Sequence, residues 1–171
     1  DYITVRKTVD QDIYPGTTGC TGGNWTLIKF DNDDNTNPTN FNFISPDTVK
    51  IQVASIYRLD YTVLVEVNDS EESGEYEILL QVEKNGIMMP DSKTIYKNIL
   101  DCQDSFTLST SFNFEADVGD IIQLLVKNNS STGIVSIKEC SFLTINHLIG
   151  CVGPEGPQGP EGPKGMTGLR G

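Results

Sequence analysis

The chain of 171 residues has little of what catalytic and metal sites are usually built from. It contains a single histidine, His147, and four cysteines with no Cys-x-x-Cys pair. A Ser-His-Asp triad needs a histidine placed beside a nucleophile, and a zinc site needs several clustered cysteines or histidines. The sequence therefore predicts a protein that is not an enzyme, and the lone histidine excludes a cupin. A jelly-roll glycosidase would require clustered catalytic carboxylates, which the pattern does not indicate.

Basic side chains are also scarce. The chain has 12 Lys and Arg against 24 Asp and Glu, a net charge of −12. The last 19 residues contribute nothing to this excess, because two acidic and two basic side chains cancel there. An acidic domain repels phosphate backbones and anionic membrane, so neither is an expected partner. No apolar run reaches 18 residues, so no membrane-inserted segment is predicted.

The four cysteines allow zero, one or two disulfides. They are too widely spaced to be the framework of a domain this size, although they are compatible with an oxidising compartment. We expect the chain, which begins at Asp1 without a methionine and ends inside a repeat, to be a piece of a longer, processed protein. The four positions are Cys20, Cys102, Cys140 and Cys151.

Glycine and proline are ordinary in number but concentrated at one end. Seven of the 16 glycines and four of the eight prolines fall within residues 153–171. Glycine recurs there at every third position, as a collagen triple helix requires, since only glycine fits at the crowded axis. A disordered linker is the alternative, but linkers do not keep phase. The axial glycines are Gly153, Gly156, Gly159, Gly162, Gly165, Gly168 and Gly171.

A triple helix predicts a homotrimer, because one strand cannot form it. The 18 residues of six triplets would extend roughly 55 Å, at about 3.1 Å each. Six triplets are marginal without imposed registration, so we expect the preceding residues to hold the three chains together. Proline occurs only directly after glycine, and charged or polar residues fill the third positions. This usage is typical of bacterial or viral collagen-like proteins.

Two residues near the repeat are candidate modification sites. Cys151 stands two residues before the first repeat glycine, where three chains converge. One interpretation is an interchain disulfide at this junction, and the alternatives are a bridge to Cys140 or a free thiol. Lys164, in Gly-Pro-Lys, is where lysyl hydroxylation would occur if the source has the enzyme.

Residues 25–146 alternate between apolar and polar with a period of two, as half-buried strands do. The clearest case is Tyr57–Val67, and Asn85-Gly86 marks a tight hairpin. About eight to ten short strands favour an all-β sandwich or barrel, and no stretch has a convincing helical period. The expected strands are Trp25–Phe30, Phe41–Ile44, Val49–Val53, Tyr57–Val67, Tyr76–Val82, Phe106–Phe114, Ile122–Val126, Ile134–Ile137 and Ser141–Ile145.

Four segments, in order, resemble the C1q/TNF-like jelly-roll family over roughly residues 41–148. Ala54–Tyr61 is similar to its Gly-x-Tyr strand, with Ser55 in place of the glycine. Lys84–Gly86 resembles its Asn-Gly hairpin, Val118–Leu124 its Gly-Asp strand entry, and Phe142–Ile145 its closing strand. Similar heads occur in spore-surface glycoproteins of bacteria and in collagen-like proteins of giant viruses and phages. In the commonest members the head follows the collagen, whereas here it precedes it.

The resemblance implies a jelly roll of about ten strands that trimerises through aromatic and aliphatic side chains along a three-fold axis. We therefore expect an N-terminal arm at 1–24, a C1q/TNF-like head at 25–150 and the start of a collagen triple helix at 151–171. The aromatics Phe41, Phe43, Phe112 and Phe114 could line a ligand groove, but core or trimer interface is the default at their spacing.

Asp31, Asp33 and Asn35 offer oxygen ligands at alternate positions, as a calcium loop would. The segment lacks the glycine and the bidentate glutamate of an EF-hand, and a solvated turn between strands is the alternative. Calcium is the one cofactor that the sequence suggests.

Four Asn-x-Ser/Thr sequons are candidate glycosylation sites in a secreted eukaryotic product and plain loops otherwise. They lie at Asn24, Asn68, Asn128 and Asn129. His147 lies where the last strand runs towards the repeat, so three copies would approach each other in a trimer. A pH switch or metal site is the functional interpretation, and an ordinary surface or interface histidine is the alternative.

The sequence as a whole predicts a non-enzymatic structural protein of a virion, spore or cell surface, outside the cell. Its head would register three chains so that the stalk can form. The alternative is a recognition tip that binds a host receptor or a glycan.

Overall fold

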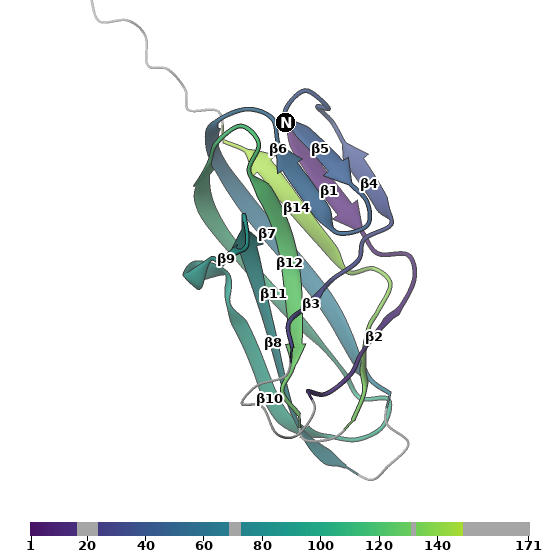
Figure 1. Cartoon of the computed structure of the whole chain (residues 1–171). Helices are drawn as coiled ribbons and strands as arrows, with labels where there is room; N and C mark the ends of the chain where they lie inside the picture. The colour runs from purple at the N-terminus through teal and green to yellow at the C-terminus, as the bar shows by residue number, and fades with distance from the viewer. Residues whose placement is uncertain (17–23, 69–72, 131–132, 149–171) are drawn as a thin grey trace, which may run out of the picture.

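The computed structural model describes residues 1–16, 24–68, 73–130 and 133–148. These residues form two antiparallel sheets that face each other as a sandwich (Figure 1). Within the described residues the helical structure is one 3₁₀ turn, η1 (Pro90–Ser92). The prediction of an all-β fold is confirmed.

Sheet A is organised around one long strand, β7. Its order is β2-β13-β7-β14-β1-β4, and β11 pairs with the other edge of β7. The strands of sheet A are β1 (Tyr2–Arg6), β2 (Gln11–Ile13), β4 (Asn32–Asn35), β7 (Ser55–Val67), β11 (Ser105–Ala116), β13 (Val135–Ile137) and β14 (Phe142–His147).

Sheet B has the order β10-β8-β12-β6-β5, with β3 on β12 and β9 on β8. Its strands are β3 (Thr26–Leu27), β5 (Phe41–Ile44), β6 (Thr48–Ile51), β8 (Gly74–Lys84), β9 (Ile87–Met88), β10 (Thr94–Leu100) and β12 (Ile121–Asn128). Edge strands β10 and β11 lie on the same side of the sandwich and contact each other.

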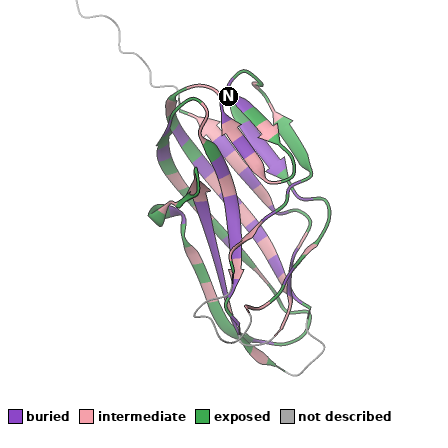
Figure 2. Cartoon of the chain, in the orientation of Figure 1, coloured by how far each residue is buried: buried purple, intermediate pink, exposed green. Residues whose placement is uncertain are grey.

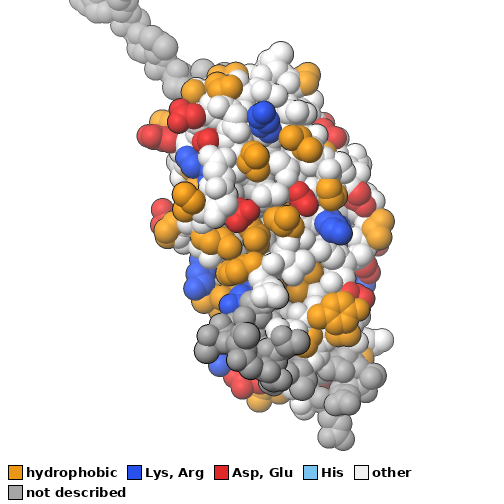
Figure 3. All heavy atoms as spheres, in the orientation of Figure 1, with side chains coloured by type: hydrophobic (Ala, Val, Ile, Leu, Met, Phe, Trp, Pro, Cys, Tyr) orange, Lys and Arg blue, Asp and Glu red, His pale blue; other side chains and the backbone are white. Residues whose placement is uncertain are grey.

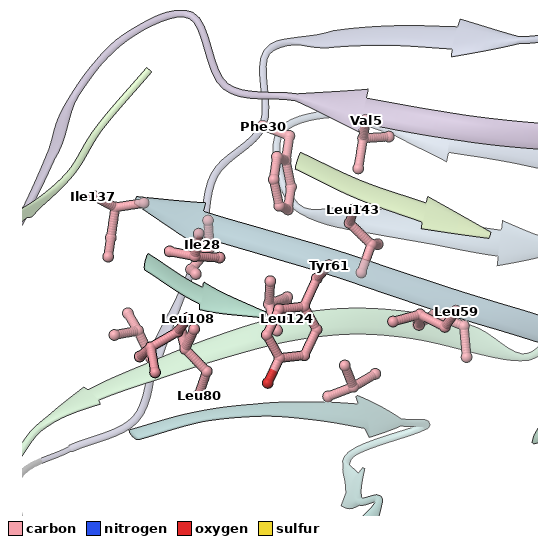
Figure 4. Packing of buried hydrophobic residues seen from close by; sticks show 14 of the residues in the cluster. Val5, Ile28, Phe30, Leu59, Tyr61, Leu80, Leu108, Leu124, Ile137 and Leu143 are labelled. Carbon is pink, nitrogen blue, oxygen red and sulfur yellow. The ribbon is translucent and has the colours of Figure 1, made fainter. Parts of the chain in front are cut away.

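The core follows from the alternation along the two longest strands. On β7 the six inward side chains from Tyr57 to Val67 are at most 1% exposed. On β8 the inward residues from Tyr76 to Val82 are at most 3% exposed. Burial of each such side chain contributes about 1.5–3 kcal/mol. Figure 4 shows how Leu59 and Tyr61 of sheet A meet Leu80 and Leu124 of sheet B between the ribbons. Figure 2 shows the same alternation, with buried residues (purple) between intermediate and exposed ones along the long strands.

The two turn motifs identified in the sequence bind each other. Asn85 and Gly86 have φ of 54° and 79°, which confirms the tight hairpin between β8 and β9. The Asn85 amide donates to the Asp120 carboxylate at 2.7 Å and accepts from the backbone N–H of Ile121 at 2.8 Å. The hydrogen bond from Asn85, with that from the N–H of Asp117, lowers the pKa of Asp120. The turn before β12 is thereby tied to the hairpin after β8.

The N-terminal segment differs from the expectation. Residues 1–24 were expected to form an arm, but their described part contributes β1 and β2 to sheet A, with Ile3, Val5 and Ile13 at most 2% exposed. The expected strand over Trp25–Phe30 is reduced to β3. Residues 32–35 were expected to be a turn, yet they form edge strand β4 because β1 offers them a free edge. Ser55 begins β7, so the missing glycine leaves that strand intact.

Tyr61 carries a buried hydroxyl that joins the two sheets. It donates to the carbonyl of Ser92 at 2.8 Å and lies 2.6 Å from the hydroxyl of Thr94. Burial raises the pKa of Tyr61 to about 12. In the unfolded chain the phenol ionises at a lower pH, so the stability that this group contributes is lost as the pH rises from about 10.

We predict that Tyr61→Phe lowers the free energy of unfolding by about 1–2 kcal/mol at pH 7, because two polar partners lose their bond. The variant should also lose less stability than the wild type between neutral and strongly alkaline pH. Urea unfolding at several pH values measures both effects, with Tyr2→Phe at an exposed tyrosine as the control. Parallel stability curves for wild type and Tyr61→Phe would contradict the assignment.

Candidate assembly surface

Both ends of the described chain lie at one end of the sandwich. The N–H of His147 donates to the carbonyl of Asp1 at 2.9 Å, and that of Leu148 donates to Ile56 at 3.0 Å. Figure 1 shows the N-terminus beside the end of β14. We call this the stalk end, because the glycine repeat that the sequence predicts to form a stalk follows β14 in the sequence. The opposite end, where β7 finishes at Val67, is the distal end.

His147 packs into the stalk end. Its ring stacks on the buried ring of Tyr57 at 5.2 Å between centroids. Its Nδ1 lies 3.3 Å from the amide nitrogen of Asn40, which also donates to the carboxylate of Asp1 at 3.2 Å. An amide nitrogen donates, so Nδ1 of His147 is the acceptor in this contact. Within the described residues the histidine therefore helps to close the end of the sandwich.

Of the four phenylalanines that the sequence suggested for a ligand groove, two lie in the core and two are only partly buried. Phe41 and Phe114 are at most 7% exposed and both pack against Tyr57, at 5.7 and 5.8 Å between ring centroids. Phe43 and Phe112 are only partly buried against the core. Phe112 alone of the four lines one of the described pockets.

The outward face of sheet A is mainly small and polar. One row across it pairs Asn113 with Arg58, Asn146 and Tyr2, and the next runs through Ser111, Asp60, Thr144 and Thr4. The hydroxyls of Thr4 and Thr144 lie 2.9 Å apart, and Arg58 Nε lies 3.2 Å from Asp60. The closing strand β14 presents Phe142, Thr144 and Asn146 on this face, one aromatic side chain beside two polar ones.

Apolar side chains are instead exposed along the edge formed by β9, β10 and β11. Ile87, Ile95 and Ile99 are 72%, 53% and 70% exposed. At Ile87 a pocket of about 310 Å³, the edge pocket, lies between the β9–η1 segment and β11. Figure 3 shows hydrophobic side chains gathered over β8, β9 and β12 on this side of the molecule. The edge pocket is lined by Ile87, Met88, Met89, Pro90 and Phe112, with Lys84, Asn85, Asp91 and Asn113 at its rim.

Sequence reasoning missed this pocket. The apolar run Ile87–Pro90 directly after the Asn-Gly hairpin was a local signal, because a tight turn leaves the residues after it exposed. The second wall comes from β11, more than 20 residues later, and only the pairing of the sheets brings it near.

The predicted calcium ligands lie at the edge of sheet A. The Asp31 carboxylate accepts from the N–H and hydroxyl of Thr8 at 2.7 and 2.8 Å. The Asn35 side chain donates to the carbonyl of Phe41 and accepts from the N–H of Asn37, both at 3.1 Å. Asp33 is exposed on β4. Among the described residues no group of three His, Cys, Asp or Glu side chains is placed to hold a metal ion, so calcium stays a prediction.

The remaining candidate residues fall in two groups. Cys102 and Cys140 are exposed free thiols. Cys151, Lys164 and the repeat glycines from Gly153 to Gly171 lie outside the described residues. Among the residues that the structure describes, no helix is long and apolar enough to cross a membrane.

The distal end carries a second pocket, of about 270 Å³, in which polar groups surround one aromatic ring. Tyr14 is 67% exposed there. Asp12, Asn24 and Thr26 supply carboxylate, amide and hydroxyl groups to the lining. An open aromatic face beside hydrogen-bonding side chains can receive a sugar ring.

The four sequons differ in exposure. Asn24, Asn68 and Asn129 are exposed, whereas Asn128 is 1% exposed. The Asn128 amide donates to the carbonyls of Ile13 and Gly133 at 3.2 and 3.0 Å, and its oxygen accepts from the N–H of Ser130. A glycan on Asn128 would break this network, so the folded chain leaves three accessible sequons.

Asn128→Ala should lower the free energy of unfolding by about 2 kcal/mol, because two buried carbonyls and one N–H lose their partner. The neighbouring Asn129→Ala, which removes one exposed contact to Glu77 at 3.4 Å, should change it by less than about 0.5 kcal/mol. Urea unfolding of both variants tests the difference. Equal effects would show that Asn128 is not the buried member of the pair.

Comparison with known proteins identifies the fold. No protein-family model matches the sequence, and no curated protein matches it. The Eiger TNF of S. frugiperda is similar in structure with a TM-score of 0.58 at 8% identity, covering 94% of this chain and 98% of that one. Murine APRIL at pH 5.0 reaches 0.50 at 14% identity, covering 86% and 98%. The globular domain of zebrafish complement 1qA reaches 0.49 at 9% identity, covering 86% and 97%. The described chain has the jelly-roll fold of the Eiger TNF and APRIL structures.

Proposed function

We propose that this protein is a non-enzymatic assembly module whose jelly-roll head joins three chains and registers a collagen-like stalk. The observation that supports this proposal is the glycine phase of residues 153–171, which begins shortly after strand β14, and β14 ends beside the N-terminus. A triple helix needs three chain ends brought together at one place. A head with this fold supplies one such end per copy.

Because each chain is strongly acidic, burial of apolar surface must drive the association of three chains. Each chain carries a net charge of −12, and the repeat contributes none of it, so three heads repel one another. The edge of β9, β10 and β11 exposes three isoleucines, and one of them, Ile87, lines the edge pocket. Burying such side chains between copies offsets the repulsion. We place the assembled molecule outside the cell, on the surface of a virion, spore or bacterium.

The full chain should have a native mass of three times 18.8 kDa and show a triple-helix signal in circular dichroism. The isolated peptide 153–171 should show no such signal at room temperature, because six triplets without registration are marginal. Native mass spectrometry and thermal melting measure both properties. A stable triple helix in the isolated peptide would contradict the registering role of the head.

A matched pair of variants separates the stalk from the head. Gly162→Ala places a methyl group at the triple-helix axis and should abolish the triple-helix signal or lower its melting temperature, while the head stays folded. Glu161→Ala changes a third-position residue next to it and should have a far smaller effect. Similar melting for the two variants would show that residues 153–171 are a linker.

A recognition module is the second candidate, and the distal pocket favours it. Tyr14 stands open at the end of the head away from the stalk, with amide, hydroxyl and carboxylate groups around it. A fibre would present this end outward, to a glycan or a host receptor. Pure assembly needs no such pocket.

On a glycan array the full chain should bind a subset of neutral sugars, and Tyr14→Ala should reduce that signal by about tenfold, since aromatic stacking is the main contact. Val118→Ala, at another exposed apolar residue, is the control. An array without hits, or equal binding by Tyr14→Ala, would leave assembly as the function.

A further inference from the structure

We propose that the edge pocket is a socket for Ile56 of a neighbouring copy, and that Asp91 at its rim pairs with Arg58 of that copy. The inference rests on the proposed trimer and adds which residues join its chains. Repeated around a three-fold axis, the contact closes a ring of three identical joints, each using a pocket from one copy and a β7 surface from the next.

The edge pocket is lined by apolar side chains of the kind that interfaces between chains bury. Two methionines, Ile87, a proline and Phe112 form its walls, and Ile87 is 72% exposed. Methionine side chains adapt their shape to an inserted group. Its volume of about 310 Å³ leaves room for an aliphatic side chain with its neighbours.

Ile56 is an apolar side chain that the head leaves without cover. It lies on the outward face of β7, where it is 48% exposed among mostly polar neighbours. Arg58, two residues further, points from the same face, and its side chain is 54% exposed. The two side chains therefore form an apolar knob beside a cation.

The register of sheet A sets the knob and the socket at the same height. Asn113 of the pocket rim pairs with Arg58 within one chain, and Glu115 pairs with Ile56. A three-fold axis that runs along the stalk relates the copies by rotation without a shift along the axis. A residue of one copy can therefore contact only residues at a similar height on the next, and Ile56 and Arg58 meet this condition for the pocket.

The charged side chains at the pocket rim also favour a contact with Arg58 of the neighbouring copy. Asp91 is exposed at the rim, and no ion pair joins it to another described residue. The rim cation Lys84 is already engaged with Asp120 at 3.5 Å and with the carbonyl of Glu115 at 2.9 Å. Among the described residues, the ion-pair partner of Arg58 is the half-buried Asp60, at 3.2 Å. An Arg58–Asp91 contact between copies would add one attraction per joint to an assembly that otherwise repels itself.

Interchain crosslinking tests the joint directly. The full chain with Ile56→Cys and Ile87→Cys should, on mild oxidation, give a band at three times the chain mass on a non-reducing gel, because three disulfides close the ring. Each single variant should give no such band beyond the wild type, which controls for the native cysteines. As a further control, Val9→Cys places a cysteine at an exposed residue on the loop after β1. Combined with Ile87→Cys, it should give no trimer band beyond the wild type.

A charge-swap cycle tests the ion pair. Arg58→Asp and Asp91→Arg should each raise the concentration at which half of the trimer dissociates by about tenfold, and the double variant should recover most of the loss. Arg6→Asp makes the same charge change on another strand of sheet A and should not be rescued by Asp91→Arg. Monomer melting of each variant separates a folding defect from weaker assembly.

The outcomes distinguish this inference from the proposed function. A trimer with neither a covalent ring nor rescue overturns the Ile56 socket and leaves the stalk-registering role standing. A chain that is monomeric by native mass overturns both. One equivalent of a fluorescent apolar dye bound per chain in the intact trimer would show a pocket open to small ligands, which also overturns the socket.

Discussion

The structure depends on the inward face of β7. This 13-residue strand places six side chains in the core and forms hydrogen bonds along both edges, to β11 on one side and to β13 and β14 on the other. Every other strand of sheet A is connected to β7 by strand pairing, and the furthest, β4, is connected through β1 and β14. A one-residue slip of β7 would turn Tyr57, Leu59 and Tyr61 to solvent and Arg58 and Asp60 into the core. The register that fixes the core also fixes which residues face a partner.

This coupling explains what the sequence could predict. Long alternating segments such as those of β7, β8 and β11 are visible because burial repeats over many residues. Asn85-Gly86 identified its hairpin because a turn with positive φ at both residues selects those two amino acids. Short strands could not be predicted in this way. Polar β4 is a strand only because β1 leaves an edge free, and no local pattern in 32–35 indicates that.

The candidate surface was harder to predict than the fold, for a related reason. Phe112 has the same local pattern as Phe114, yet it lines the edge pocket while Phe114 lies in the core at 7% exposure. The difference lies in what each ring faces: Phe112 lines the pocket with the β9–η1 segment, and Phe114 packs on Tyr57 of β7, both far from β11 in the sequence. His147 was singled out for its position near the repeat, and the structure gives it a packing role against Tyr57.

The position of β14 has a mechanical consequence. It lies between β7 and β1, paired with both along most of its length, and the chain leaves it at the stalk end. Hydrogen bonds between antiparallel strands run perpendicular to the strands. If the chain after β14 forms the proposed stalk, a pull directed along β14 would load all the bonds of β14 together in shear, whereas an edge strand pulled sideways would lose them one at a time. Pairing of β14 with both neighbours is the arrangement that would best resist such a pull.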